Sequence, residues 1–157
     1  MEMWDNPNWV WGLSLIALTI VIHSMAIVMM ALVALRIRAR LETRGYALWK
    51  LVAVLICVIG VIGLLLAVLH AIECAIWAAA YWSLGAAHSL MGALLYSVDS
   101  MSTRGASGLV LQPHWRLMGA LEAINGMLLF GVSAAYIFAV MQVYWPMLAA
   151  HVISKKS

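Results

Sequence analysis

The stretch of sequence that decides the fold reads AAHSLMGALLYSVDSMSTRGASG and runs from Ala86 to Gly108. Its first part, Ala86 to Val98, is apolar, and its second part is polar and contains glycine. A helix that crosses a bilayer needs about 20 apolar residues, and this part offers about 13. Either it joins the residues from Trp77 onward as a fourth full span, or it is a short helix that enters the membrane and turns back. Irregular backbone at membrane depth requires burial in protein or a watery cavity, so the second interpretation predicts a pathway.

Three longer apolar tracts surround this stretch, and each is long enough for a transmembrane helix: 9–35, 51–77 and 115–144. Pro146 is expected to help end the last of these helices. Hydrophobic residues make up 66% of the 157 residues and charged residues only 10%. Soluble domains carry about 25% charged residues, so the composition excludes a soluble enzyme, a secreted disulfide scaffold and a disordered chain. We predict one all-α membrane domain over residues 1–157.

Positive charge is concentrated in the connection 36–50, whose basic residues are Arg36, Arg38, Arg40, Arg44 and Lys50. Short loops rich in Lys and Arg stay in the cytoplasm, so we expect the acidic amino terminus to lie outside. Three spans and a helix that turns back then place the carboxyl terminus, with Lys155 and Lys156, in the cytoplasm.

The sequence contains no arrangement that indicates catalysis, such as a nucleophile beside a base or a phosphate-binding loop. Cys57 and Cys74 lie in apolar tracts without metal or disulfide spacing. The net charge of +3 arises mostly from one short connection, which gives no reason to expect nucleic acid. We therefore predict a protein that is not an enzyme, holds no cofactor and has the lipid bilayer as its surroundings.

Histidines near the membrane tracts raise a separate question. His70 and Glu73 lie three residues apart, His88 lies at the start of the short helix, and His23 lies in the middle of the first span. A buried imidazole and carboxylate can bind a metal or sense pH. No further ligand follows at a fixed spacing, so we expect these side chains to hold helices together, with no metal. A four-span bundle that binds haem through His70, His88 or His23 remains an alternative.

Two strings carry a resemblance: ALLYSVDSMSTRGASG (93–108) and PHWRLMGALEAINGMLLFGVSAAYIFAV (113–140). They resemble the pore module of the potassium-channel superfamily, and more narrowly the small bacterial two-pore-domain-like ion channels, with one pore loop per chain. Members typically show a pore helix, a filter T-x-G-Y-G-D, and an inner helix that begins WRLLGA-EA-NG. The resemblance implies that 86–98 is a re-entrant pore helix, 99–113 a filter-like loop and 115–144 the inner helix. It also implies a homotetramer in the bacterial inner membrane.

By this resemblance the filter positions are Thr103, Arg104, Gly105, Ala106 and Ser107, with Gly108 at the family's acidic position. A potassium filter works because carbonyl oxygens from four copies replace the hydration shell of the ion. Ser107 stands where the family has its second glycine, and a non-glycine residue in left-handed backbone costs about 1–2 kcal/mol. The family's tyrosine is Ala106. We therefore expect passive conduction of monovalent cations such as K⁺ or Na⁺, with weak or altered potassium selectivity.

Asp99 and Arg104 are expected to form a charged pair behind the filter, where each would satisfy the other. Two other geometries remain open. Arg104 can face external water while Asp99 caps a turn, or four Arg104 side chains can point into the pore and repel cations.

The resemblance places Glu122 near the back of the filter and Asn125 nearer the central cavity. Both lie on one face of the last helix because they are three residues apart. They can attract cations, or they can bond neighbouring helices, as polar residues in membranes often do. Gly126, with Gly119 and Gly131, is expected to allow close helix packing rather than to act as a gating hinge.

The leading functional hypothesis is a tetrameric pore for cations. A non-conducting, channel-like scaffold or assembly subunit is the alternative that explains the altered filter directly.

Overall fold

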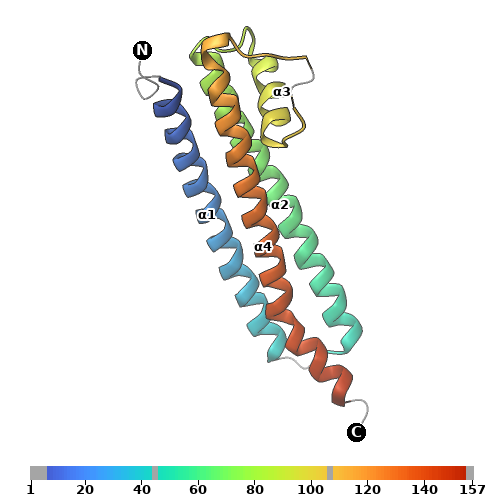
Figure 1. Ribbon diagram of the computed structural model, residues 1–157. Helices are drawn as coiled ribbons and strands as arrows, with labels where there is room; N and C mark the ends of the chain where they lie inside the picture. The colour runs from blue at the N-terminus through green and yellow to red at the C-terminus, as the bar shows by residue number, and fades with distance from the viewer. Residues whose placement is uncertain (1–6, 44–45, 106–107, 155–157) are drawn as a thin grey trace. The chain divides into compact units, whose positions relative to one another are not determined.

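The computed structural model describes residues 7–43, 46–105 and 108–154 (Figure 1). Within these ranges the helices are α1 (Pro7–Glu42), α2 (Leu48–Ser83), α3 (Leu90–Met101) and α4 (Arg116–Ser154), and a 3₁₀ turn, η2 (Pro113–Trp115), precedes α4. No strand occurs in the described residues, which confirms the all-α prediction. Three helical stretches, Pro7–Glu42, Leu48–Ser83 and Pro113–Ala150, are long and apolar enough to cross a membrane. The remaining helix, α3, has 12 residues.

The long helices continue past the predicted spans. Arg36, Arg38 and Arg40 lie in the last turns of α1, so most of the predicted basic loop is helical. The expectation that Pro146 helps to end the last helix was wrong, because α4 continues to Ser154. Proline removes one backbone hydrogen bond, and membrane helices tolerate this loss through local adjustments that satisfy the freed group.

The short helix begins later than the apolar run that predicted it. Gly85 adopts a left-handed φ of 70°, which turns the chain after α2. Ser89 then caps α3, because its side-chain oxygen accepts a hydrogen bond from the amide of Gly92 at 3.0 Å. The helix also runs on through Asp99, a residue that the sequence had placed in the loop.

The chain forms two compact units, and each long helix contributes to both. The first, which we call the α3 unit, comprises the described parts of 1–23 and 68–131, and the second comprises those of 24–67 and 132–157. In the second unit, the Tyr144 hydroxyl donates a hydrogen bond to the carbonyl of Ala34 at 2.7 Å. A largely apolar groove of about 420 Å³ also lies there between α1 and α2, beside Val33 and Val58.

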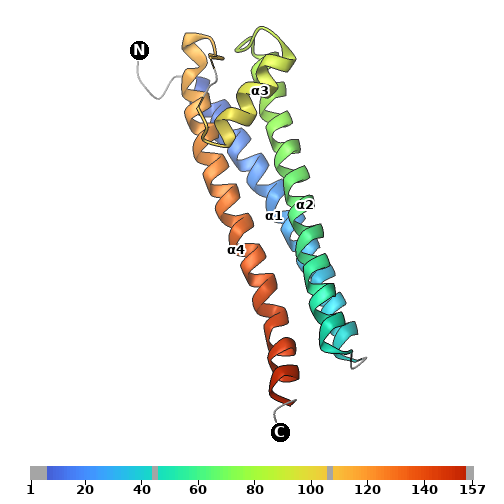
Figure 2. The same ribbon diagram turned by 90° about the vertical axis from the view of Figure 1, so that its right-hand side faces the viewer.

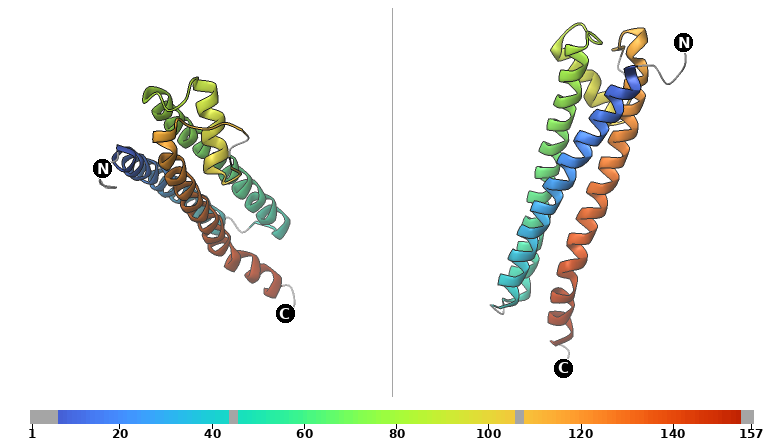
Figure 3. Two further views of the ribbon diagram at one scale, coloured as in Figure 1. Left: turned by 45° about the horizontal axis from the view of Figure 1, so that its top comes forward. Right: turned by 90° about the vertical axis from the view of Figure 1, so that its left-hand side faces the viewer.

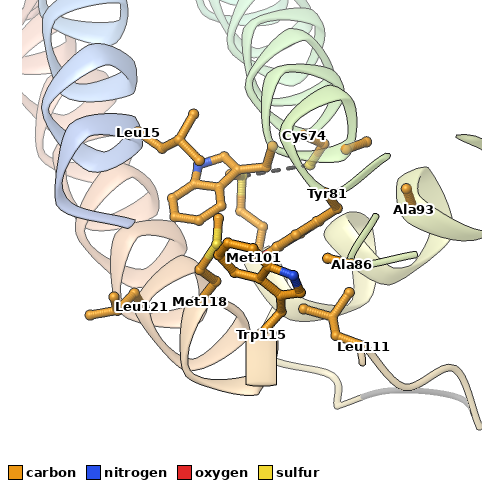
Figure 4. Close-up of a cluster of buried hydrophobic side chains, with 12 residues drawn as sticks. Leu15, Cys74, Tyr81, Ala86, Ala93, Met101, Leu111, Trp115, Met118 and Leu121 are labelled. Carbon is orange, nitrogen blue, oxygen red and sulfur yellow. Dashed lines mark hydrogen bonds between the residues drawn. The ribbon is translucent and has the colours of Figure 1, made fainter. Parts of the chain in front are cut away.

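The core of the α3 unit combines aromatic, sulfur-containing and aliphatic side chains that converge from all four helices (Figure 4). Tyr81, Met101 and Met118 are almost completely buried, and the Cys74 thiol contacts the Met101 sulfur at 3.6 Å. The cluster therefore fastens α3 to α2 and α4.

Polar residues line the interior of the α3 unit. The buried positions of α1 there repeat every three or four residues, so they form one stripe along the helix: Asn8, Gly12, Leu15, Thr19 and His23. Large apolar side chains such as Val10 and Val21 are exposed instead. Polar groups inside and apolar groups outside are the arrangement expected where lipid surrounds a helix bundle.

Candidate functional site

The α3 segment enters the α3 unit and returns to the end at which it started. The amide of Gln112 donates a hydrogen bond to the carbonyl of Ala86 at 3.0 Å, so the chain after α3 comes back beside its beginning. The far end of α3 lies deep along α4, because Gly126 packs against the carbonyl of Met101. At 1.5 Å per residue from Arg116, that contact lies about 15 Å along α4. Figures 2 and 3 show α3 alongside α2 and α4. We call residues 86–112 the α3 hairpin.

Glu122 holds the α3 hairpin in place. Its side chain is fully buried and accepts a hydrogen bond from the Tyr81 hydroxyl at 2.7 Å. Ser97 of α3 contacts the same carboxyl group and donates to the carbonyl of Cys74 at 2.9 Å. A second serine, Ser100, donates to the carbonyl of Gly119 at 2.8 Å. Hydroxyl groups thus satisfy a carboxyl group that would otherwise be costly to bury, and Glu122 links α2, α3 and α4.

Asn125 faces α1 within the chain. It is fully buried, and its amide donates to the Thr19 hydroxyl at 2.9 Å. This geometry fits the interpretation that Asn125 bonds neighbouring helices. The sequence did not identify Thr19 as its partner, although Thr19 lies in the buried stripe of α1.

The glycines of α4 have different surroundings. A Cβ atom on Gly119 would collide with the Tyr96 hydroxyl, and one on Gly126 would collide with the Met101 backbone. A Cβ atom on Gly131 would meet nothing within 4 Å. Close packing therefore explains Gly119 and Gly126, whereas Gly131 has no such role among the described residues.

In the described part of the loop after α3, three residues have left-handed backbone. Thr103 has φ 56°, Gly105 has φ 79° and Gly108 has φ 84°. Left-handed backbone costs Thr103 about 1–2 kcal/mol, and the sequence offered no signal for this strain. The predicted filter residues Ala106 and Ser107 lie outside the described residues. Thr103, Arg104 and Gly105 are exposed in the single chain.

The structure brings Asp99 and Arg104 together. The Nε atom of Arg104 lies 3.3 Å from Oδ1 of Asp99, and the Arg104 amide donates to the Asp99 carbonyl at 3.0 Å. The Asp99 side chain is 7% exposed, but that of Arg104 is 69% exposed. Within one chain the pair thus lies at the edge of the unit, with the carboxylate inside and the guanidinium outside.

A hollow of about 270 Å³ opens between the end of α3 and α4. Small residues of α4, Gly119, Ala120 and Ala123, leave this space, and Thr103 and Gly105 of the loop line its other side. The backbone of the loop therefore lies against an open recess rather than against packed side chains.

The predicted histidines separate into two places. His88 is exposed at the start of the α3 hairpin, where its Nε2 atom lies 3.1 Å from the side-chain nitrogen Nε2 of Gln112. His70 and Glu73 lie together, as their spacing indicates, and His23 of α1 joins them. The sequence treated His23 as a separate packing residue because nothing in its position on α1 shows which part of α2 lies opposite.

Comparison of the chain with protein-family models, with curated proteins and with solved structures gave no match.

Proposed function

We propose that this protein is the subunit of a tetrameric ion-channel pore, which conducts monovalent cations passively and discriminates weakly between potassium and sodium. The observation that carries the proposal is the α3 hairpin. A helix too short to cross a bilayer goes about 15 Å into the helix unit, ends in a polar loop and returns beside Ala86.

The cost of polar backbone in a bilayer explains why this hairpin suggests a pore. Polar, irregular backbone at depth in a bilayer is tolerated only inside protein or beside water. The loop leaves Thr103 and Gly105 exposed next to an open hollow, so one chain alone does not cover it. Further copies of the chain, or water between them, would provide the surroundings that the loop requires.

The number of copies follows from the resemblance to the potassium-channel superfamily. A filter needs carbonyl groups from all sides of the ion, and one chain supplies a single loop. Four copies complete it. Gly105 occupies the filter glycine position that this sequence keeps. Its left-handed φ of 79° is a conformation that glycine adopts without steric cost, which supports that assignment.

Weak selectivity follows from the residues at the upper filter positions. Ala106 and Ser107 replace the tyrosine and the second glycine of the family. Without them, the carbonyl groups closest to the outside lack the support that holds their spacing. The remaining positions, Thr103 to Gly105, provide the ion-binding part of the pore.

The orientation of the subunit follows from its charges. The arginines at the end of α1 support a cytoplasmic position for that end and an external position for the start of α1. The α3 hairpin then opens to the outside of a bacterial inner membrane.

A non-conducting scaffold is the second candidate, and Arg104 favours it. Its side chain is 69% exposed beside the loop, and four such charges at a pore entrance would repel cations. In that case the protein would assemble as a channel does without passing ions.

Ion flux into proteoliposomes tests the proposal. We expect the purified tetramer to admit both potassium and sodium, and Gly105→Ala to reduce the flux because left-handed backbone disfavours a side chain. Gly60→Ala is the matched control, since a Cβ atom there meets nothing within 4 Å and φ is not left-handed. A tetramer that admits neither ion would favour the scaffold. A monomeric mass in mild detergent and in bilayers would contradict both candidates.

A further inference from the structure

Three side chains that can ligate a metal converge inside the α3 unit. His23 of α1 places its Nδ1 atom 2.9 Å from Oε1 of Glu73, and His70 places its Nδ1 atom 3.1 Å from Oε2 of the same carboxylate. The candidate ligand atoms all lie within 4.8 Å of one another. Glu73 is 0% exposed and His23 is 1% exposed, so the group is an interior feature.

The three side chains come from two helices, α1 and α2. His70 and Glu73 are three residues apart on α2, so they share one face of that helix. His23 ends the buried stripe of α1 and reaches the same place from the other side. Phe130 of α4 stacks on the His70 ring at a centroid distance of 4.2 Å and fixes the plane of that ring.

Two imidazoles and one carboxylate form a ligand set that binds zinc and related divalent ions. Around a tetrahedral ion with bonds of about 2.0–2.1 Å, neighbouring ligand atoms lie about 3.3 Å apart. The observed contacts of 2.9 and 3.1 Å therefore need only small side-chain shifts. Three protein ligands also leave a fourth coordination position for water.

We infer that His23, His70 and Glu73 form a binding site for a divalent transition metal such as Zn²⁺, which ties α1 to α2 inside the α3 unit. The carboxylate provides the negative charge that a divalent ion requires in an apolar environment. The His70 side chain, 11% exposed, forms the outer edge of the site and the side from which an ion enters. The test of the site is independent of the proposed conduction, because metal binding is measured without any ion flux.

Cobalt titration of the full-length chain tests the site, because Co²⁺ in a tetrahedral site absorbs visible light. The chain is purified in detergent without a polyhistidine tag, stripped with a chelator and titrated with Co²⁺, then with Zn²⁺ as competitor. We expect one Co²⁺ per chain, displaced by Zn²⁺. His23→Gln and Glu73→Gln should each weaken binding by more than about 100-fold, which exceeds the usual effect of outer-shell changes. His88→Gln, an exposed histidine outside the group, should bind as the parent does.

Two measurements separate loss of a ligand from loss of folding. Helix content and elution volume are compared for every variant, and His23→Cys supplies a thiolate in place of the imidazole. We expect His23→Cys to regain binding and to add the charge-transfer absorption of a cobalt–thiolate bond. Absence of saturable binding in the folded parent would overturn the inference, as would unchanged binding in folded His23→Gln. Loss of binding in His88→Gln would also overturn it, because it would assign the metal to another place.

Discussion

The amide of Gln112 donates a hydrogen bond to the carbonyl of Ala86, and this one bond returns the chain to the place where the α3 hairpin began. Between these two residues lie the whole of α3 and a loop whose described part contains the left-handed residues Thr103, Gly105 and Gly108. A segment that closes on itself in this way has both ends on one side of the α3 unit. The sequence left open whether this segment crosses the bilayer, and the bond favours a segment that does not cross.

Cysteine labelling tests this topology. The exposed Cys57 is replaced by alanine, the buried Cys74 is kept, and single cysteines are introduced at Ser89, Val110 or Thr43. We expect a membrane-impermeant maleimide added outside to label Ser89→Cys and Val110→Cys, and to label Thr43→Cys only after the membrane is opened. Labelling of the first two from opposite sides would establish a fourth span.

Two glycines of α4 predict a contrast in stability. Gly126→Ala places a methyl group against the Met101 carbonyl, which is backbone and cannot move aside alone. We expect a loss of about 1–3 kcal/mol in the free energy of unfolding, typical of overpacking. Gly131→Ala is the control on the same helix, and we expect no loss because alanine is the better helix former. Unfolding in detergent followed by circular dichroism measures both. Equal effects would contradict the close approach of α3 and α4.

A pair of tyrosines tests the role of Glu122. Tyr81→Phe removes a hydroxyl that donates to this buried carboxyl group, and we expect a loss of about 1–3 kcal/mol. Tyr136→Phe removes a buried hydroxyl without a hydrogen-bond partner in the described part of the chain, so we expect little or no loss. The same unfolding measurement compares the two variants. A larger loss for Tyr136→Phe would place the main polar network elsewhere.

The contact between Asp99 and Arg104 predicts that the cost of changing either residue depends on whether four chains assemble. In one chain Arg104 is largely exposed, and such a pair is worth about 0–1 kcal/mol. Assembly of four chains would cover Arg104, and breaking a buried pair costs about 3–5 kcal/mol, while removal of both partners can be nearly neutral. We therefore expect Asp99→Ala and Arg104→Ala each to destabilise the tetramer, and the double variant to recover much of the loss. Small, additive losses in tetramer melting would instead leave Arg104 in water or in the pore.

Selectivity provides the last prediction. We expect a reversal potential near zero with potassium on one side of the bilayer and sodium on the other, because Ala106 and Ser107 lack the supports of a potassium filter. The double change Ala106→Tyr with Ser107→Gly should shift the reversal potential toward that of potassium. A strong potassium preference in the parent would mean that the backbone holds the potassium geometry without them.

The sequence by itself determined the helical class and three long apolar tracts, because a bilayer sets a minimum length for an apolar tract. It left open whether 77–113 holds a fourth full span or a short helix over 86–98 that turns back. Helix ends were less predictable, since α1 and α4 continue beyond their apolar parts. Hydrogen bonding within a helix does not stop where the membrane stops, and Pro146 did not end α4.

Tertiary structure alone decided which polar residues meet. Asn125 bonds to Thr19, and His23 joins His70 and Glu73, although these partners lie far apart in the sequence. Spacing along one helix predicts which of its residues share a face, but it does not identify the helix that lies opposite. Most residues of these helices are apolar, so the pattern that normally separates an inner from an outer face is weak. The few polar groups must find each other to avoid lipid, and their pairing sets the packing of the α3 unit.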